Sequence, residues 1–140
     1  MSKVLTNLLA LKSADSTVDA MIFSELFPEK IPSPIVESGY GWRFEGDHWW
    51  LETGEDSRTP RQTIIPPRYT GSLEAALTLI PDGWETAIYL GGSETCVQIE
   101  TEDMRLQLDF YPLEAFAPFP ALAVCIACWK ARLYDQGIFY

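Results

Sequence analysis

The order of apolar and polar positions predicts two helices at the start of the chain. Residues 2–12 carry apolar side chains near helical spacing, and residues 15–27 repeat this pattern. Asp15 or Ser16 can cap the second helix by accepting hydrogen bonds from free backbone N–H groups, and Pro28 ends it. Helical spacing, with an apolar stripe facing inward, is followed by Val18, Met21, Ile22, Glu25 and Leu26.

Alternating aromatic and polar residues predict a β-hairpin over residues 40–52, with its turn at Gly46-Asp47. The aromatic positions that this alternation involves are Tyr40, Trp42, Phe44 and, after the turn, Trp50. Residues 53–67 contain three prolines and several charges, and they form a loop longer than most connections in compact domains. Loops of this length are usually functional or mobile.

A third helix is predicted over residues 72–80. Ser72 is placed to cap it, and Pro81-Asp82-Gly83 ends it as a tight turn. The side chains expected on its buried face are Leu73, Ala76, Leu77 and Ile80.

Three antiparallel strands are predicted next, over residues 84–90, 94–100 and 104–110. Gly91-Gly92 and Thr101-Glu102-Asp103 suit the two hairpin turns between them. The third segment alternates cleanly, which indicates a sheet with one buried and one wet face. Its expected inward side chains are Met104, Leu106, Leu108 and Phe110.

A last helix is predicted over residues 120–133, because a proline in the first helical turn leaves no amide unpaired and Lys130 and Arg132 suit a helix C-terminus. The element order predicts the α+β class, as a single-domain helix/antiparallel-sheet/helix sandwich. In this arrangement, helices 15–27 and 120–133 pack against the sheet and helix 72–80 connects.

Length and composition fit one domain spanning residues 1–140. The chain has 140 residues, of which 47% are hydrophobic and 21% charged, and this excludes the class of disordered proteins. No apolar run approaches the ~20 residues that a membrane-spanning helix needs. Residues 1–11 lack a clean signal-peptide cleavage site. We therefore expect a cytoplasmic protein without a membrane partner.

The formal net charge of −10 changes the expected partners. Binding to duplex nucleic acid depends on Lys and Arg releasing counterions, so direct duplex binding is not expected. The excess of acids is explained either by solubility alone or by a surface that imitates nucleic acid and occupies a basic groove of another protein.

Four segments in order carry a family resemblance. Residues 19–28 form an acidic and apolar helix, a tryptophan-rich middle follows, residues 69–76 read Tyr-Thr-Gly-Ser-Leu-Glu-Ala-Ala, and residues 120–127 read Pro-Ala-Leu-Ala-Val-Cys-Ile-Ala. Over most of its length the chain resembles the phage ABA sandwich domain proteins. The resemblance implies a helix/sheet/helix sandwich in a viral protein of a bacteriophage or prophage, located in the cytoplasm of the bacterial host. It implies no reaction and no functional residues.

The chain offers no enzyme chemistry. Cys125 and Cys128 lie one turn apart in an apolar helix, where free cysteines are usually buried, reduced and without metal, and Cys96 stands alone. His48 is the only histidine, so it cannot complete a metal cluster, and Asp47 beside it points to the opposite strand face. No catalytic or metal-binding motif is present. We expect no catalytic residue, no metal and no cofactor.

Arginines and tryptophans form the most suggestive group of candidate ligand-binding residues. Arginine binds phosphate through a planar two-pronged donor set, and aromatic faces stack on bases. A local basic pocket can hold a nucleotide in an acidic protein, because distant charge is screened. Alternatively, the tryptophans fill the core and the arginines pair with nearby carboxylates. The candidate residues are Arg58, Arg61, Arg68, Trp42, Trp49 and Trp50.

Three functions follow from these observations. The first is a non-enzymatic counter-defence protein that sequesters a small nucleotide signal of host immunity. The second is an acidic nucleic-acid mimic that inhibits a host nuclease or CRISPR complex. The third is a phage assembly or housekeeping protein. Acids gathered on one exposed face would favour the second, and a concave site lined by the arginines and a tryptophan would favour the first.

The C-terminal tail, residues 134–140, ends in apolar and aromatic groups after Gly137. Chain ends are usually polar unless they are held in place. An apolar tail therefore predicts docking, either onto its own domain or onto a partner, and we expect a homodimer or higher homo-oligomer.

Overall fold

The computed structural model describes residues 2–28, 41–45, 48–52, 63–106 and 111–138, with the backbone alone for 41–45, 48–52 and 63–64. The chain divides into two compact units. The larger unit comprises residues 1–14 and 68–140, and the smaller unit comprises residues 15–67. That residues 1–140 form a single domain stays a prediction.

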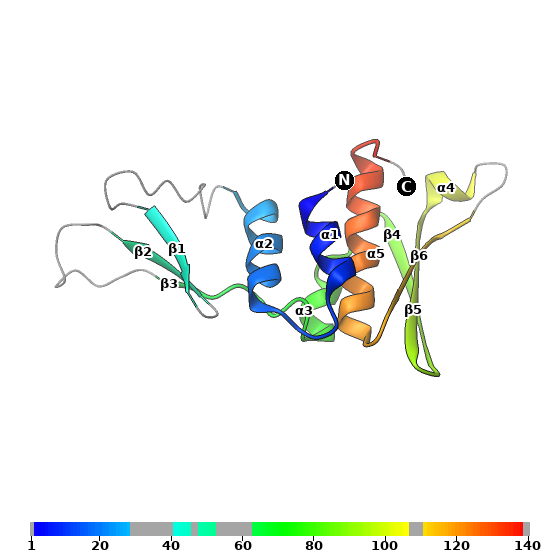
Figure 1. The fold of residues 1–140 in the computed structure, drawn as a ribbon. Helices are drawn as coiled ribbons and strands as arrows, with labels where there is room; N and C mark the ends of the chain where they lie inside the picture. The colour runs from blue at the N-terminus through cyan, green and yellow to red at the C-terminus, as the bar shows by residue number, and fades with distance from the viewer. Residues whose placement is uncertain (1, 29–40, 46–47, 53–62, 107–110, 139–140) are drawn as a thin grey trace. The chain divides into compact units, whose positions relative to one another are not determined.

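Helices and a three-stranded antiparallel sheet make up the larger unit (Figure 1). Its helices are α1 (Lys3–Ala10), α3 (Leu73–Leu77), α4 (Glu102–Arg105) and α5 (Pro120–Asp135). Its strands lie in the order β4 (Trp84–Gly91), β5 (Glu94–Thr101) and β6 (Leu113–Ala117). The predicted α+β class, with a helix packed on an antiparallel sheet, is confirmed.

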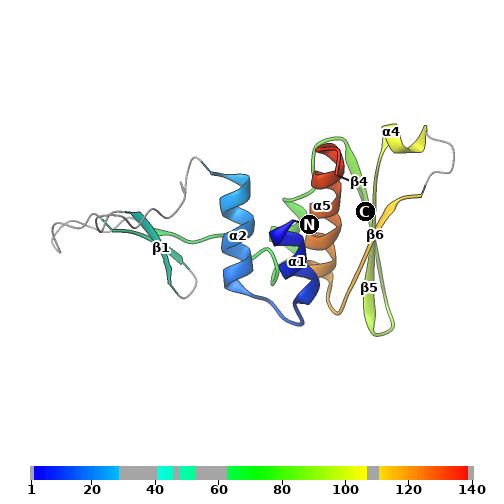
Figure 2. The ribbon, with the colours of Figure 1, turned by 45° about the horizontal axis from the view of Figure 1, so that its top comes forward.

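Helix α5 is buried on nearly all sides because it forms a middle layer. It packs against β5 and β6 on one side and contacts α1 and α3. Figures 1 and 2 both place α5 between α1 and the sheet. Every residue from Ala121 to Trp129 is buried, as expected of a helix that is apolar all round. Pro120 occupies the first turn, as predicted.

One serine ties α1 to α5. The Ser2 hydroxyl oxygen accepts a hydrogen bond from the Leu5 amide at 3.3 Å, which caps α1, and another from the Trp129 indole N–H at 3.1 Å. Leu5 and Leu8 are fully buried. The predicted helix over residues 2–12 is therefore present, although it ends at Ala10.

Helix α3 begins as predicted but buries less than predicted. The Ser72 hydroxyl accepts from the Ala75 amide at 3.2 Å, and Gly83 ends the following turn at a φ of 84°. Ala76 is fully buried, whereas Leu73 and Leu77 are 38% and 40% exposed. The predicted buried face is wrong at these two leucines, because a five-residue helix has room for only a narrow contact with α5.

The third strand is not where the alternation predicted it. Residues 102–105 form the short helix α4, so Thr101-Glu102-Asp103 is not a hairpin turn. Met104 is buried but Leu106 is 80% exposed, which a strand with one buried face would not give. Residues 107–110 lie outside the described part of the chain. The third strand is β6, with the small side chains of Ala115 and Ala117 buried beneath α5.

The first two strands agree with the prediction to within one residue. Gly91 pairs with Glu94, so the hairpin turn is Gly92-Ser93 rather than Gly91-Gly92. Gly92 has a φ of 65°, which residues with a side chain rarely adopt.

The described part of the C-terminal tail folds back on α5. Gly137 has a φ of 80°, the Gly137 amide donates to the Tyr134 carbonyl at 2.9 Å, and the Ile138 amide donates to the Leu133 carbonyl at 2.9 Å. These two bonds form the Schellman arrangement that satisfies the last carbonyls of a helix. Residues 139–140 lie outside the described part of the chain.

The smaller unit contains α2 (Ser16–Leu26) and a three-stranded antiparallel sheet in the order β1 (Gly41–Glu45), β2 (His48–Glu52) and β3 (Thr63–Ile64). The carboxylate of Asp15 caps α2 by accepting from the Val18 amide at 3.0 Å, as predicted. The hairpin over residues 40–52 is confirmed by the β1–β2 register. Its turn residues 46–47, and residues 53–62 of the long loop, lie outside the described residues.

Candidate functional site: the outer face of the larger sheet

The sheet of the larger unit has two different faces. Side chains alternate along a strand, and the register places every second residue of neighbouring strands on the same face. The inner face buries Val97, Ile99, Ala115 and Ala117. The outer face is partly or fully exposed. Its members are Glu85, Ala87, Tyr89, Glu94, Cys96, Gln98, Glu100, Glu114 and Phe116.

Carboxylates dominate this outer face. Glu85 and Glu100 are directly opposite each other on β4 and β5, where like charges repel. Arg105 from α4 relieves the repulsion. Its Nη2 donates to Glu85 Oε2 at 2.6 Å and to Glu100 Oε1 at 3.0 Å, and these bonds, the one to Glu85 first, raise the pKa of the guanidinium. Glu94 and Glu114 carry further negative charge, so the face remains acidic in sum.

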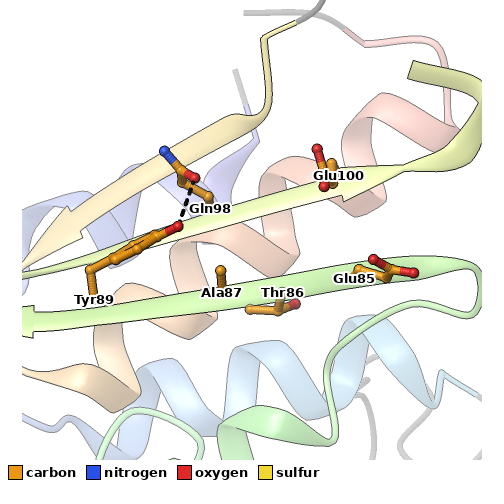
Figure 3. A pocket seen from close by; sticks show the side chains of 6 residues that line it. All are labelled: Glu85, Thr86, Ala87, Tyr89, Gln98 and Glu100. Carbon is orange, nitrogen blue, oxygen red and sulfur yellow. Dashed lines mark hydrogen bonds between the residues drawn. The ribbon is translucent and has the colours of Figure 1, made fainter. Parts of the chain in front are cut away.

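A line of polar contacts crosses all three strands. The Tyr89 hydroxyl donates to Gln98 Oε1 at 3.4 Å (Figure 3), and Gln98 Nε2 donates to Glu114 Oε1 at 3.2 Å. These contacts fix the side chains without covering them. The Tyr89 side chain remains 55% exposed and that of Phe116 remains 56% exposed.

A shallow depression of about 160 Å³ lies on this face (Figure 3). It is lined by Glu85, Thr86, Ala87, Tyr89, Gln98 and Glu100. Pockets for drug-sized ligands typically measure about 300–1,000 Å³. The depression is therefore smaller than a typical ligand pocket, and its two carboxylates, Glu85 and Glu100, already accept hydrogen bonds from Arg105.

The three cysteines differ in environment. Cys125 and Cys128 are buried, as predicted, and the Cys125 thiol donates to the Tyr69 carbonyl at 3.1 Å. Burial raises the pKa of the Cys128 thiol to about 12. Cys96 lies on the outer face, where desolvation and, second, the charge of Glu114 raise the pKa of its thiol. Neither Cys96 nor Cys128 is an activated nucleophile, because that requires a lowered thiol pKa.

The six predicted ligand-binding residues are distributed over both units. Trp42 lies in β1, opposite Leu51, and Trp49 and Trp50 lie in β2, opposite Phe44 and Arg43. Arg58 and Arg61 lie outside the described residues. Arg68 belongs to the larger unit and is exposed, and its carbonyl accepts from the Gly71 and Ser72 amides at 3.1 and 2.8 Å. A nucleotide site formed by these six residues stays a prediction.

Within the described ranges, no group of three or more His, Cys, Asp and Glu side chains is arranged to hold a metal ion. None of the helices in the described part of the chain is both long and apolar enough to cross a membrane.

The sequence interpretation did not identify the outer face. One signal was present: Glu85, Ala87 and Tyr89 alternate in β4, and Gln98 and Glu100 continue the polar set in β5. Phe116 could not be assigned to this face, because the third strand was predicted over residues 104–110 whereas β6 spans Leu113–Ala117.

Comparison with known proteins adds no relative. No family model, no curated protein and no solved structure matches this chain. The resemblance to the phage ABA sandwich domain proteins therefore stays a prediction.

Proposed function

We propose that this chain is a non-enzymatic binding protein whose outer sheet face docks onto a basic protein surface of the kind that normally holds nucleic acid. In the phage setting expected from the sequence, the partner would be a host nuclease or a CRISPR complex. The single observation that carries the proposal is the exposed face that combines four glutamates with two exposed aromatic rings.

Charge complementarity is the first support. Four glutamates share this face with one arginine, namely Glu85, Glu94, Glu100, Glu114 and Arg105. Glu102 and Asp103 are exposed on the adjoining helix α4. Such a surface repels phosphate backbones and attracts the Lys and Arg side chains that bind them, which speeds association and selects basic partners.

The exposed aromatic rings are the second support. Solubility alone requires charge and gives no reason for Tyr89 and Phe116 to lie uncovered among carboxylates. Protein interfaces are enriched in aromatic residues, which supply contact area and much of the binding energy. The combination of acids and rings therefore favours protein docking over a purely solvating surface.

The proposal predicts a salt-sensitive affinity for polycations that depends on this face. Poly-L-arginine is the probe, titrated calorimetrically at two salt concentrations. The face variant combines Glu94→Gln with Glu114→Gln. The charge-matched control combines Glu25→Gln with Glu74→Gln, two exposed residues of helices α2 and α3 that do not belong to the outer face. Both variants have lost the same net charge, so any difference between them reports the position of the lost carboxylates. The face variant should bind several-fold more weakly than the control.

A competition experiment then separates docking from general attraction. A basic nuclease bound to labelled DNA is mixed with the wild-type chain, the face variant or the control. Release of DNA by wild type and control, and not by the face variant, supports the proposal. Equal behaviour of the two charge-matched variants in both experiments contradicts it.

A further inference from the structure

Strand β4 is an open edge of the larger sheet. It is eight residues long, Trp84–Gly91, and it pairs with β5 in an unbroken register. Among the residues that the structure describes, no strand lies on its other side. An edge of this kind presents unpaired N–H and C=O groups and is a template for another strand.

The residues of β4 that present these groups can be derived from the register. The pair that closes a two-residue hairpin, here Gly91 and Glu94, is hydrogen-bonded, and bonded pairs alternate with non-bonded ones. Thr86, Ile88 and Leu90 therefore direct their backbone groups away from β5. Trp84 lies two residues before Thr86 and belongs to the same alternating set. Its amide donates away from β5, to the Pro81 carbonyl at 3.2 Å.

The opposite edge of the sheet is protected and β4 is not. β6 has five residues, lies between Pro112 and Pro118, and its Glu114 carbonyl accepts from Lys130 Nζ at 2.9 Å. Prolines, lysines and short length are the devices that block edge pairing. β4 contains no proline, no lysine and one charged residue, Glu85. Instead, it exposes Leu90 at 72% and Tyr89 at 55%.

We propose that β4 pairs with β4 of a second copy of this chain, antiparallel and centred on Ala87, to form a continuous six-stranded sheet. Two-fold symmetry makes such an interface self-complementary. In this register Ala87 lies opposite itself as a non-hydrogen-bonded pair, where the backbones are closest, at about 4.5 Å between Cα atoms. The small alanine suits that position.

The remaining pairs of this register are also complementary. Thr86 lies opposite Ile88 of the second copy, and Trp84 lies opposite Leu90. In these pairs the backbone groups that point away from β5 meet those of the second copy and form about six hydrogen bonds in total. Glu85 lies opposite Tyr89 of the second copy and avoids the second Glu85. Leu90, which is exposed in the single chain, lies opposite Trp84 of the second copy. Pairing would also join the two acidic outer faces side by side.

A cysteine at the two-fold axis tests the register. Ala87→Cys is made together with Cys96→Ser, which removes the one native thiol on that face, since Cys125 and Cys128 are buried. A Cα separation of about 4.5 Å permits a disulfide, so mild oxidation should yield a cross-linked dimer on non-reducing gels. Phe116→Cys in the same background is the control, because position 116 is also exposed but lies on β6, and it should stay uncrosslinked.

The oligomeric state provides the second measurement. Wild type should have the mass of a dimer by light scattering, and Thr86→Pro or Leu90→Lys should shift it to a monomer with unchanged circular dichroism. If the Thr86→Pro variant does not fold, the Leu90→Lys variant provides the test, since Leu90 is exposed in the single chain. A monomeric wild type, equal cross-linking at positions 87 and 116, or a dimer that survives Leu90→Lys and is lost on deletion of residues 138–140 would overturn the proposal.

Discussion

The indole nitrogen of Trp84 donates a hydrogen bond to the carboxylate of Asp135 across 2.9 Å, which joins the first residue of β4 to the last residue of α5. The Trp84 ring is buried and meets Tyr134 edge to face, with 5.7 Å between ring centroids. This contact holds the start of the sheet to the end of the helix that forms the core.

Trp84→Phe should lower the free energy of unfolding by about 2–3 kcal/mol, because it removes a hydrogen bond to a charged acceptor and part of a buried ring. Asp135→Asn is the control, since an amide oxygen still accepts the bond, and it should cost less. Urea titration of both variants measures the difference. A larger loss for Asp135→Asn than for Trp84→Phe would show that the carboxylate acts through another contact.

The raised pKa of Cys128 predicts a pH effect on stability. The thiol pKa is about 12 in the folded chain and 9.0 as the reference for an exposed thiol. Below pH 9 both states keep the proton and stability is unaffected. Between pH 9 and 12 the unfolded chain ionises first, so stability should fall by up to about 1.4 kcal/mol per pH unit.

Cys128→Ala should remove this part of the slope, which denaturant titrations from pH 8 to 10.5 can compare with wild type. Iodoacetamide at pH 8 should modify Cys96 and leave Cys125 and Cys128 unmodified until the chain unfolds, because only Cys96 is partly exposed. Parallel slopes for wild type and Cys128→Ala would contradict the assignment.

Gly137→Ala should destabilise the chain by about 1–2 kcal/mol, because a φ of 80° is unfavourable for a residue with a Cβ. Gly91→Ala is the matched control. A Cβ at Gly91 would meet no atom within 4 Å, and its φ is not positive, so the substitution should be tolerated. Thermal unfolding of the two variants gives the comparison, and equal melting temperatures would argue against the Schellman end of α5.

Arg105→Gln should strengthen binding of poly-L-arginine, in contrast to the usual effect of removing a surface charge pair. The substitution leaves the opposed carboxylates of Glu85 and Glu100 without their intramolecular cation. We expect an affinity gain of about threefold to tenfold at low salt, which disappears as salt screens the face. An unchanged affinity would indicate that polycations bind away from these two glutamates.

The nucleotide-binding prediction for the arginine and tryptophan group has its own test. Calorimetry against a panel of cyclic and linear nucleotides should find affinity without turnover, and Arg68→Ala should weaken it by about one to two orders of magnitude. Arg105→Gln is the matched control and should leave that affinity unchanged. If no nucleotide binds, or if the recovered ligand is hydrolysed, the sequestration hypothesis fails.

Helix ends and turns could be predicted from the sequence wherever a single residue type determines the local backbone conformation. Ser72 and Asp15 cap helices, Gly83 and Gly92 adopt positive φ, and Pro120 opens α5. In each case the residue acts on groups within three or four positions, so no knowledge of distant parts is required. The apolar composition of residues 121–129 likewise determined that this helix would be buried.

Only the tertiary structure decided which segment became the third strand. Residues 104–110 alternate more clearly than Leu113–Ala117, yet the chain uses the latter, because Ala115 and Ala117 let α5 approach the sheet closely. The same packing covers one face of the sheet, whereas the described side chains of the other face are partly or fully exposed. Glu85, Glu100 and Arg105 therefore meet through strand pairing and a short helix, contacts that depend on register between distant segments and have no signature in local sequence.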